Sequence, residues 1–348
     1  MQTLDRPDTT PYTALGSPVL YEALNKFSGQ TPVISIISPI YNEIENVELL
    51  LKEILDVGLT MNVPMEVILV DDGSTDSPVK AIQSYIDALP GIVNLIELSR
   101  NYGQSAAMAA GLAQAQGEII VTLDGDLQND PRDIPMLIQN LVDLDLDMVT
   151  GWRQNRQDAV VTRKLPSWIA NRIIGRLTGL KFTDYGCSLK VYRRDLAKSL
   201  KLYGELHRFI PFLASMEGAK MAEFPVNHRA RMYGKSKYNL SRTLKVVLDL
   251  MSLMFMRRFF ARPLHMFGRL GMYISAVGVL TLLYLAIDKL AFHHNIGDRP
   301  LLLLGAMLVI TGVQMVSTGL LAEMQVHSFF HTDTRTPFKI RRVHTGLS

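Results

Sequence analysis

The chain has 348 residues, which is enough for one large domain or two ordinary ones. Its 36 lysines and arginines nearly balance its 33 aspartates and glutamates, so the net charge of +3 does not single out nucleic acid as a partner. Cys187 is the single cysteine, which excludes an intrachain disulfide and fits a reducing compartment.

Residues 1–31 are expected to form an N-terminal arm. The stretch is mostly polar and lacks the basic start and apolar core of a secretion signal. The N-terminal half is therefore expected to stay on the side of the membrane where it is made.

Apolar runs rich in β-branched residues alternate with segments of helical spacing over residues 32–239. The runs predict strands, the segments predict helices, and their alternation predicts an α/β fold with a doubly wound, mostly parallel sheet. We assign residues 32–239 to this one domain. Strands are expected at residues 33–38, 65–70, 93–98 and 119–123, with helices between them at 46–57, 79–88 and 104–116.

The predicted strand at 119–123 is followed by the first motif whose residues are suited to catalysis or metal binding. Asp124 and Asp126 flank Gly125 there, so two carboxylates on a tight turn are able to converge on one hard cation. Mg²⁺ and Mn²⁺ prefer such oxygen ligands, and Mg²⁺ commonly completes its shell with substrate phosphates. On its own, the motif is weak evidence, because acidic turns are common.

A second polar cluster follows the strand at 65–70. Asp71 and Asp72 are placed to hydrogen-bond a nucleotide base or ribose. Alternatively the turn is structural, with Ser74 or Asp76 capping the next helix.

The loop after the first strand supplies Pro39, Tyr41 and Glu43. The proline is expected to stiffen the loop, the tyrosine offers a ring face, and the glutamate offers an acceptor for base or ribose hydroxyls. Ligands of doubly wound sheets bind at the carboxyl ends of strands, so all three clusters are expected to share one site.

Two long apolar segments predict a transmembrane hairpin over residues 264–322, with spans at about 268–290 and 300–322. The uninterrupted runs at 271–287 and 301–321 are close to the ~20 residues that a span needs. A pair of buried core helices is the alternative.

Basic residues flank this hairpin on both outer sides, which places its two ends and the N-terminal half in the cytoplasm. We expect a multi-pass protein of the plasma (inner) membrane. Residues 240–263 are expected to form interfacial amphipathic helices, with a core helix as the alternative, and residues 323–348 a cytoplasmic tail. The flanking residues are Arg257, Arg258, Arg262 and Arg269 before the hairpin, and Arg335, Lys339, Arg341 and Arg342 after it.

The order of the motifs SPIYNE, DDGSTD and DGDLQ, each at a strand end, resembles the GT-A-fold family 2 glycosyltransferases over residues 33 to about 240. Further segments are similar to the polyprenyl-phosphate sugar synthases, which include the dolichyl-phosphate mannose synthases. RQNRQD with DYGC also resembles the undecaprenyl-phosphate aminoarabinose transferases. The further segments are SRNYGQ (99–104), GWR (151–153), GELHRFIP (204–211) and RMYGKSKY (231–238).

The resemblance implies a hexosyltransferase that moves a sugar from a nucleotide donor onto polyprenyl (undecaprenyl) phosphate, for glycan or lipid modification, with Mg²⁺ or Mn²⁺ as cofactor. We expect a UDP-hexose donor, and a GDP-mannose-dependent mannose synthase is the alternative. The partners would be the nucleotide sugar, the lipid phosphate and the membrane, without nucleic acid, and the chain is compatible with a homo-oligomer.

The same resemblance implies roles for individual residues. Arg163 and Ser167 are one helical turn apart, so both are able to face one phosphate. Arg231 and Lys237 lie in a segment that resembles a mobile flap over the donor diphosphate. Solvated surface charges are the alternative for these basic residues. The metal ligands would be Asp124, Asp126 and Gln128; the donor residues Pro39, Tyr41, Glu43, Asp71, Asp72, Arg231 and Lys237; the acceptor-phosphate residues Arg153, Arg163 and Ser167; and the catalytic residues Asp124, Asp126, Arg153 and Arg163.

The acceptor chemistry predicts an inverting mechanism. A phosphate monoester has a second pKa near ~6 and is largely dianionic at neutral pH. It needs orientation and charge screening rather than a general base, so direct in-line displacement inverts the anomeric carbon. His207 is accordingly expected to be structural.

Other function classes fit the sequence less well. A processive polysaccharide synthase would carry a Gln-x-x-Arg-Trp segment and more membrane helices. A catalytically silent scaffold that binds nucleotide sugar would not need the intact acidic and basic residues. No Gly-x-Gly-x-x-Gly follows a predicted strand, which excludes a dinucleotide oxidoreductase.

Overall fold

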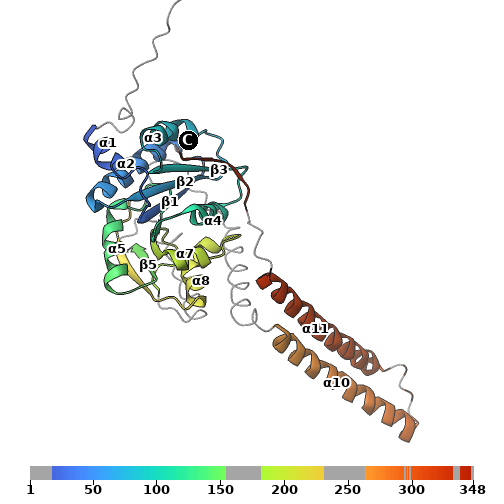
Figure 1. The fold of residues 1–348 in the computed structure, drawn as a ribbon. Coiled ribbons are helices and arrows are strands. Elements are labelled where there is room, and N and C mark those ends of the chain that lie inside the picture. Colours follow the sequence, from blue (N-terminus) through green and yellow to red (C-terminus); the bar gives the residue numbers. More distant parts are fainter. Residues whose placement is uncertain are drawn as a thin grey trace, which may run out of the picture. The chain divides into compact units, whose positions relative to one another are not determined.

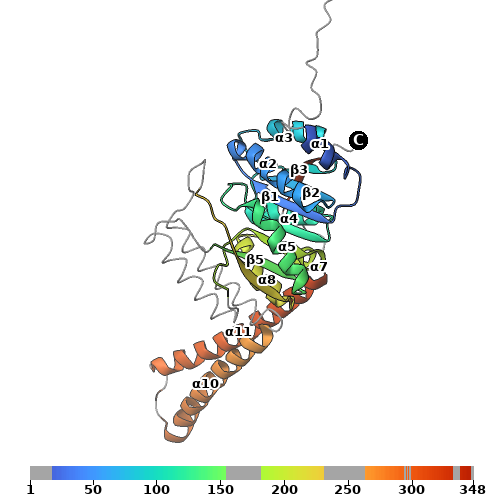
Figure 2. The ribbon, with the colours of Figure 1, turned by 90° about the vertical axis from the view of Figure 1, so that its left-hand side faces the viewer.

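The structure is a computed structural model that describes residues 18–153, 182–230, 263–293, 295, 297, 299–331 and 338–345. The chain divides into two compact units, one from residues 1–240 and 336–348 and the other from residues 241–335. Figures 1 and 2 label their helices and strands.

An eight-stranded sheet with the order β7-β5-β6-β4-β1-β2-β3-β8 is the framework of the first unit. The four strands predicted from sequence pair in parallel as neighbours, so their carboxyl ends meet at one edge. The β4–β6, β5–β6 and β3–β8 pairs are antiparallel. The strands are β1 (Ile34–Ile40), β2 (Met65–Asp71), β3 (Val93–Leu98), β4 (Ile119–Thr122), β5 (Met148–Arg153), β6 (Lys190–Arg193), β7 (Met221–Val226) and β8 (Ile340–His344).

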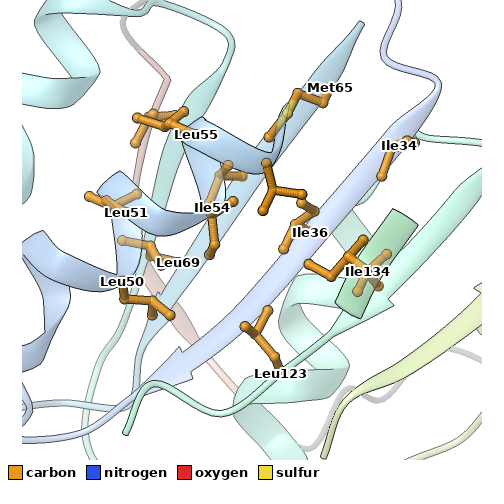
Figure 3. Packing of buried hydrophobic residues seen from close by; sticks show 14 of the residues in the cluster. Ile34, Ile36, Leu50, Leu51, Ile54, Leu55, Met65, Leu69, Leu123 and Ile134 are labelled. Carbon is orange, nitrogen blue, oxygen red and sulfur yellow. The ribbon is translucent and has the colours of Figure 1, made fainter. Parts of the chain in front are cut away.

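Helices cover both faces of this sheet, which is why its central strands are apolar at consecutive positions. On one face, Ile36 and Leu69 belong to the same buried cluster as Ile54 of α2 (Figure 3). On the other face, α4 approaches so closely that a side chain at Gly111 would collide with Ile37. The helices are α1 (Pro18–Asn25), α2 (Ile44–Met61), α3 (Val79–Ala88), α4 (Gln104–Gln114), α5 (Ile134–Asp143), α7 (Arg194–Ser199) and α8 (Ile210–Met216), with short 3-10 turns at Pro131–Asp133 and Leu206–Phe209.

Both ends of this unit differ from the sequence expectation. Helix α1 falls within the predicted arm of residues 1–31, and its Leu24 is fully buried in the core, so the fold includes the chain from Pro18 on. The predicted tail of residues 323–348 contains β8, which pairs with β3 and places His344 against Glu97. A five-residue strand whose partner lies so far back in the chain leaves no periodic signal long enough to detect.

The second unit is a hairpin of α10 (Pro263–Phe292) and α11 (Pro300–His331), both long and apolar enough to cross a membrane. Large apolar side chains point outward along both helices; Leu283 is 53% exposed and Leu303 is 70% exposed. The charged groups lie toward the helix ends, where Arg299 pairs with Asp288 at 2.7 Å. Outward apolar side chains with charged ends suit a lipid surrounding better than a protein core.

Glycines allow the two helices to touch. Gly271 and Gly278 of α10 and Gly305, Gly312 and Gly319 of α11 recur every seven residues, the spacing of a helix pair in left-handed packing. A Cβ at position 312 would lie 2.5 Å from the carbonyl oxygen of Gly271. Backbone therefore packs directly on backbone at this crossing.

We expect Gly312→Ala to loosen the hairpin, because the added methyl group collides with the backbone of α10. Overpacking costs on the order of 1–3 kcal/mol, against a gain of up to about 1 kcal/mol from the helix propensity of alanine. The melting temperature of the full-length protein in detergent should fall. Gly268→Ala is the matched control, because a Cβ there meets only the Leu264 side chain at 3.4 Å. Equal falls in both variants would contradict the packing argument.

Truncation after residue 337 should destabilise the first unit, because it removes β8 and leaves the edge of β3 open. The ladder is flanked by backbone hydrogen bonds from Ser99 to Lys339 (3.0 Å) and from Gly91 to Thr345 (2.9 Å). A loss of about 2 kcal/mol lowers the melting temperature of a domain of this size by about 4–8 °C. Truncation after Thr345 keeps every one of these bonds and should melt like the full chain; a shared drop would show that β8 is not the cause.

Candidate functional site

The loops after β1 and β2 are hydrogen-bonded to each other at the carboxyl edge of the sheet. Asn42 donates its N–H to Ser74 Oγ (2.9 Å) and accepts the N–H of Thr75 on Oδ1 (2.8 Å). Asp76 Oδ2 accepts the N–H of Ile44, the first residue of α2 (3.0 Å). The turn after β2 therefore caps α2, and not the helix that follows it.

Five of the seven predicted donor residues lie at the ends of β1 and β2 or directly after them. Pro39 lies inside β1 rather than in the loop beyond it, and Tyr41 and Glu43 follow directly. Asp71 is the last residue of β2, and its Oδ1 accepts the N–H of Ser74 at 3.0 Å. Burial raises the pKa of Asp71. These side chains thus share the edge where the acidic pair also lies.

Asp72 shapes the loop that follows β3. Its two carboxylate oxygens accept the N–H groups of Tyr102 (2.7 Å) and Gly103 (2.8 Å). Burial raises its pKa and outweighs these hydrogen bonds. Next to it, a Cβ on Gly73 would lie 2.5 Å from the carbonyl carbon of Arg100, so only glycine fits. Asp72 thus joins the loops of β2 and β3.

The acidic pair occupies the turn after β4. Asp126 is 8% exposed, and Oδ1 of Asp124 accepts Nε2 of Gln104 at 2.6 Å. Burial, followed by the charge of Asp126, raises the pKa of Asp124 to about 6. Leu127 completes the turn with a φ of +58°, a conformation that non-glycine residues adopt rarely and often at functional sites. Two carboxylates in this position gain from a cation beside them.

Gly125 presses this turn against the end of β1. A Cβ there would lie 2.9 Å from Cγ2 of Ile40 and 3.1 Å from the carbonyl oxygen of Pro39. Gln128, the third predicted metal ligand, lies on the same turn and donates its backbone N–H to Asp126 Oδ1 at 3.2 Å. The turn that carries the acidic pair is therefore in direct contact with the end of β1, where the loop with Tyr41 and Glu43 begins.

Arg153, at the end of β5, is held by a carboxylate. Its Nε and Nη2 donate to the two oxygens of Asp184 at 2.6 and 2.8 Å, and the two side chains are only 14% and 9% exposed. The guanidinium is thus paired within the protein on one edge. Asp184 belongs to the DYGC segment that the sequence analysis singled out. Its role as the partner of Arg153 was not predicted, because Arg153 lies far away in the sequence, at the end of β5.

Three further residues around the acidic pair were missed from sequence. The Ser188 hydroxyl hydrogen-bonds Asp124 and accepts Nδ2 of Asn129 at 2.6 Å. Lys190 lies behind them on β6, 2% exposed. The sequence feature that could have revealed Lys190 is a lysine between a leucine and a valine in an apolar strand. Polar side chains therefore lie beneath the acidic pair, on its buried side.

The chain before residue 231 is fixed beside the acidic turn. Arg229 donates its N–H to the carbonyl of Gln128 (2.8 Å), and its guanidinium pairs with Glu53 (2.7 Å) and Asp130 (2.7 Å). The segment predicted to cover the donor diphosphate thus begins at the site. Four predicted site residues lie outside the described residues: Arg163, Ser167, Arg231 and Lys237.

Within the described residues, no three histidine, cysteine, aspartate or glutamate side chains are grouped for one metal ion. The oxygen donors predicted for this turn are the carboxylates of Asp124 and Asp126 and the side-chain amide of Gln128. That set fits Mg²⁺ or Mn²⁺ rather than Zn²⁺, because Mg²⁺ typically takes one or two carboxylates and leaves the rest of its shell to water and phosphate.

The sequence is similar to a known protein family and to two relatives of named activity. The model of the family "Glycosyl transferase family 2" matches residues 35–201. A dodecaprenyl-phosphate galacturonate synthase of Rhizobium johnstonii is 44% identical over 90% of this chain and 94% of its own. An undecaprenyl-phosphate 4-deoxy-4-formamido-L-arabinose transferase of Pseudomonas fluorescens is 35% identical over 89% of each chain.

Among solved structures, glucosyl-3-phosphoglycerate synthase of Mycobacterium tuberculosis, crystallised with Mn²⁺ and UDP-glucose, superposes with a TM-score of 0.50 over 72% of this chain and 84% of that one. The two chains are 19% identical, so the similarity shows the fold alone. It confirms the predicted α/β sheet of the GT-A type.

Proposed function

The chain belongs to the polyprenyl-phosphate sugar transferases of glycosyl transferase family 2, and from this premise we propose that it transfers a hexose from a nucleotide donor to undecaprenyl phosphate. The observation that carries the proposal is the acidic pair Asp124 and Asp126, set against the end of β1 at the edge where the loops of β1 to β4 meet. A nucleotide sugar with its diphosphate at the pair fits that arrangement.

The donor we propose is a UDP-hexose. The two relatives are named for a galacturonate and a substituted arabinose, so a UDP-hexuronate is the first related donor to test beside the UDP-hexoses. Tyr41, Glu43 and Asp71 would take the base and ribose, since they follow β1 and end β2. GDP-mannose remains the alternative donor.

Asp124, Asp126 and Gln128 would hold Mg²⁺ or Mn²⁺, and the ion, when bound, would offset the negative charge that builds on the leaving nucleotide. The mutual repulsion of the two carboxylates supports this assignment, because it is relieved by a cation. The protein's own part is to hold both carboxylates in one turn, with Gln104 and Ser188 fixing Asp124.

The acceptor phosphate would be oriented by arginines. Arg163 and Ser167 are four positions apart in the sequence, and Arg153 lies at the end of β5 with one edge held by Asp184. A phosphate dianion needs no base, so these residues would supply orientation and charge, and the in-line attack would invert the anomeric carbon. Arg231 and Lys237 would close on the donor diphosphate from the segment that starts after Arg229.

The membrane supplies the acceptor lipid. We place the α10–α11 hairpin across the plasma (inner) membrane, with the first unit in the cytoplasm. The apolar exterior of the hairpin and the basic residues on its outer flanks support this orientation.

Full-length protein in detergent, given undecaprenyl phosphate, Mg²⁺ or Mn²⁺ and a panel of nucleotide sugars, should form a lipid-linked sugar from a UDP-hexose or UDP-hexuronate. EDTA should abolish it. The double variant Asp124→Asn with Asp126→Asn should lose at least about 10³-fold in rate, because it removes the charge that holds the ion. Asp56→Asn, on the exposed face of α2, is the control and should keep full activity. Turnover by the double variant at the wild-type rate would end the metal assignment, and no product from any donor would end the proposal.

Arg163→Ala should raise the KM for undecaprenyl phosphate by at least about tenfold, in line with the ~1.5–3 kcal/mol of a hydrogen bond to a charged group. The KM for the nucleotide sugar should change less than twofold, because the arginine is assigned to the acceptor alone. Initial rates measured while each substrate is varied in turn separate the two effects. Equal losses for both substrates would remove Arg163 from the acceptor site.

A further inference from the structure

The turn that carries the acidic pair continues through residues 128–130, and this far side of it is held by residues 228–229. The carbonyl oxygen of Gln128 accepts the backbone N–H of Arg229 at 2.8 Å. The next residue of the turn, Asn129, forms an isolated antiparallel β-bridge with His228. These contacts are made by the backbone, so they fix the course of the chain through Gln128 without engaging its side chain.

The side chain of Arg229 reinforces the backbone contact through two carboxylates. Its Nη1 donates to both oxygens of Glu53 on α2, at 2.7 and 2.9 Å. Its Nη2 lies 2.7 Å from Oδ2 of Asp130, whose side chain is only 7% exposed. Water screens such partly buried ion pairs much less than exposed ones. One guanidinium therefore ties the turn to α2, and its engagement by two carboxylates suits a supporting role better than contact with a phosphate.

The turn needs support because its backbone is strained. Leu127 has a φ of +58°, which is unfavourable for a residue with a bulky side chain. Strained residues persist only where the surrounding structure holds them in place. The buried side chain of Leu127 anchors the middle of the turn, and the contacts of Arg229 anchor the far side. Gln128 lies between these two anchors, and its N–H donates to Asp126 Oδ1 at 3.2 Å.

We propose that Arg229 is a positioning residue for the metal site, which holds Gln128 where its side-chain amide reaches the ion. The inference rests on the proposed function, in which Gln128 is the third metal ligand beside the acidic pair. Arg229 itself would not touch the ion, because a guanidinium offers only donors. Residues that orient metal ligands in this way typically account for about 10–100-fold in metal affinity.

The test is Mn²⁺ binding to the full-length protein in detergent with UDP present, followed by electron paramagnetic resonance. Arg229→Met removes both ion pairs and keeps the backbone N–H; it should weaken Mn²⁺ binding at least about tenfold. Arg229→Lys keeps a positive charge and should recover most of that loss. Arg132→Met is the matched control, because it removes another arginine from Asp130, one that is 74% exposed, and leaves Arg229 in place. It should bind Mn²⁺ as wild type does.

A second comparison tests whether Arg229 acts through Gln128. The variant Gln128→Ala should also weaken Mn²⁺ binding, because it removes the third ligand. In the double variant with Arg229→Met, the loss should be smaller than the product of the two single losses, since a misplaced amide and an absent amide have the same effect. Losses that multiply would show that the two residues act independently, and would overturn the inference.

A purely structural arginine would give a different result. Arg229→Met would then lower the melting temperature while the folded protein bound Mn²⁺ as wild type does. An equal loss of Mn²⁺ affinity in Arg132→Met would also refute the inference, since any change at Asp130 would then suffice.

The variant Glu53→Gln is the milder substitution if Arg229→Met does not fold, because it leaves the pair with Asp130. It should still weaken Mn²⁺ binding at least about threefold, and unchanged affinity would count against the inference. If neither variant folds, the arginine is structural and the inference fails.

Failure of the proposed function has its own signature. Wild-type protein would then bind no Mn²⁺ even with UDP and would form no lipid-linked sugar. If wild type binds Mn²⁺ and is active while Arg229→Met keeps its Mn²⁺ affinity, only the role of Arg229 is refuted.

Discussion

The repulsion between two carboxylates on one tight turn, Asp124 and Asp126, is the constraint on which the rest of the site depends. Burial and the charge of Asp126 raise the pKa of Asp124, and hydrogen bonds and positive charge around Asp124 oppose that rise. Gln104, Ser188 and Lys190 supply them from α4, from the segment before β6 and from β6 itself. The acidic turn therefore takes its partners from three separate elements.

Hydrogen bonds between side chains and backbone N–H groups join the loops around this turn. Asp72 is hydrogen-bonded by two N–H groups of the loop after β3, and Gly125 rests against the carbonyl of Pro39. Such contacts leave little room for adjustment, so the loops form a pre-organised edge on which few side chains are free to vary. The side chains that we propose for the donor, Tyr41 and Asp71 among them, are thereby presented from a rigid base.

Sequence patterns were sufficient where the physics is local. The four parallel strands were predicted because short β-branched runs alternate with helices, and the acidic pair was found because parallel strands bring their carboxyl ends together. The ion pair of Arg153 with Asp184, the charge behind Asp124 and the pairing of β8 with β3 all join residues far apart in the chain. The spacing of residue types along the sequence does not indicate contacts between residues so far apart in the chain. Pro39 was misplaced for a smaller reason, since β1 extends two residues beyond the predicted strand.

The pairing of β8 with β3 changes what counts as the catalytic domain. The apolar hairpin is inserted between β7 and β8, so the sheet is completed by residues that follow the predicted membrane spans. A fragment that ends at residue 240 would keep the acidic pair but expose the N–H and C=O groups of β3 along one edge. That edge continues into the loop of Tyr102 and Gly103, which Asp72 holds. The hairpin is therefore more than a candidate membrane span, because it is also the part of the chain that lies between β7 and the strand that completes the sheet.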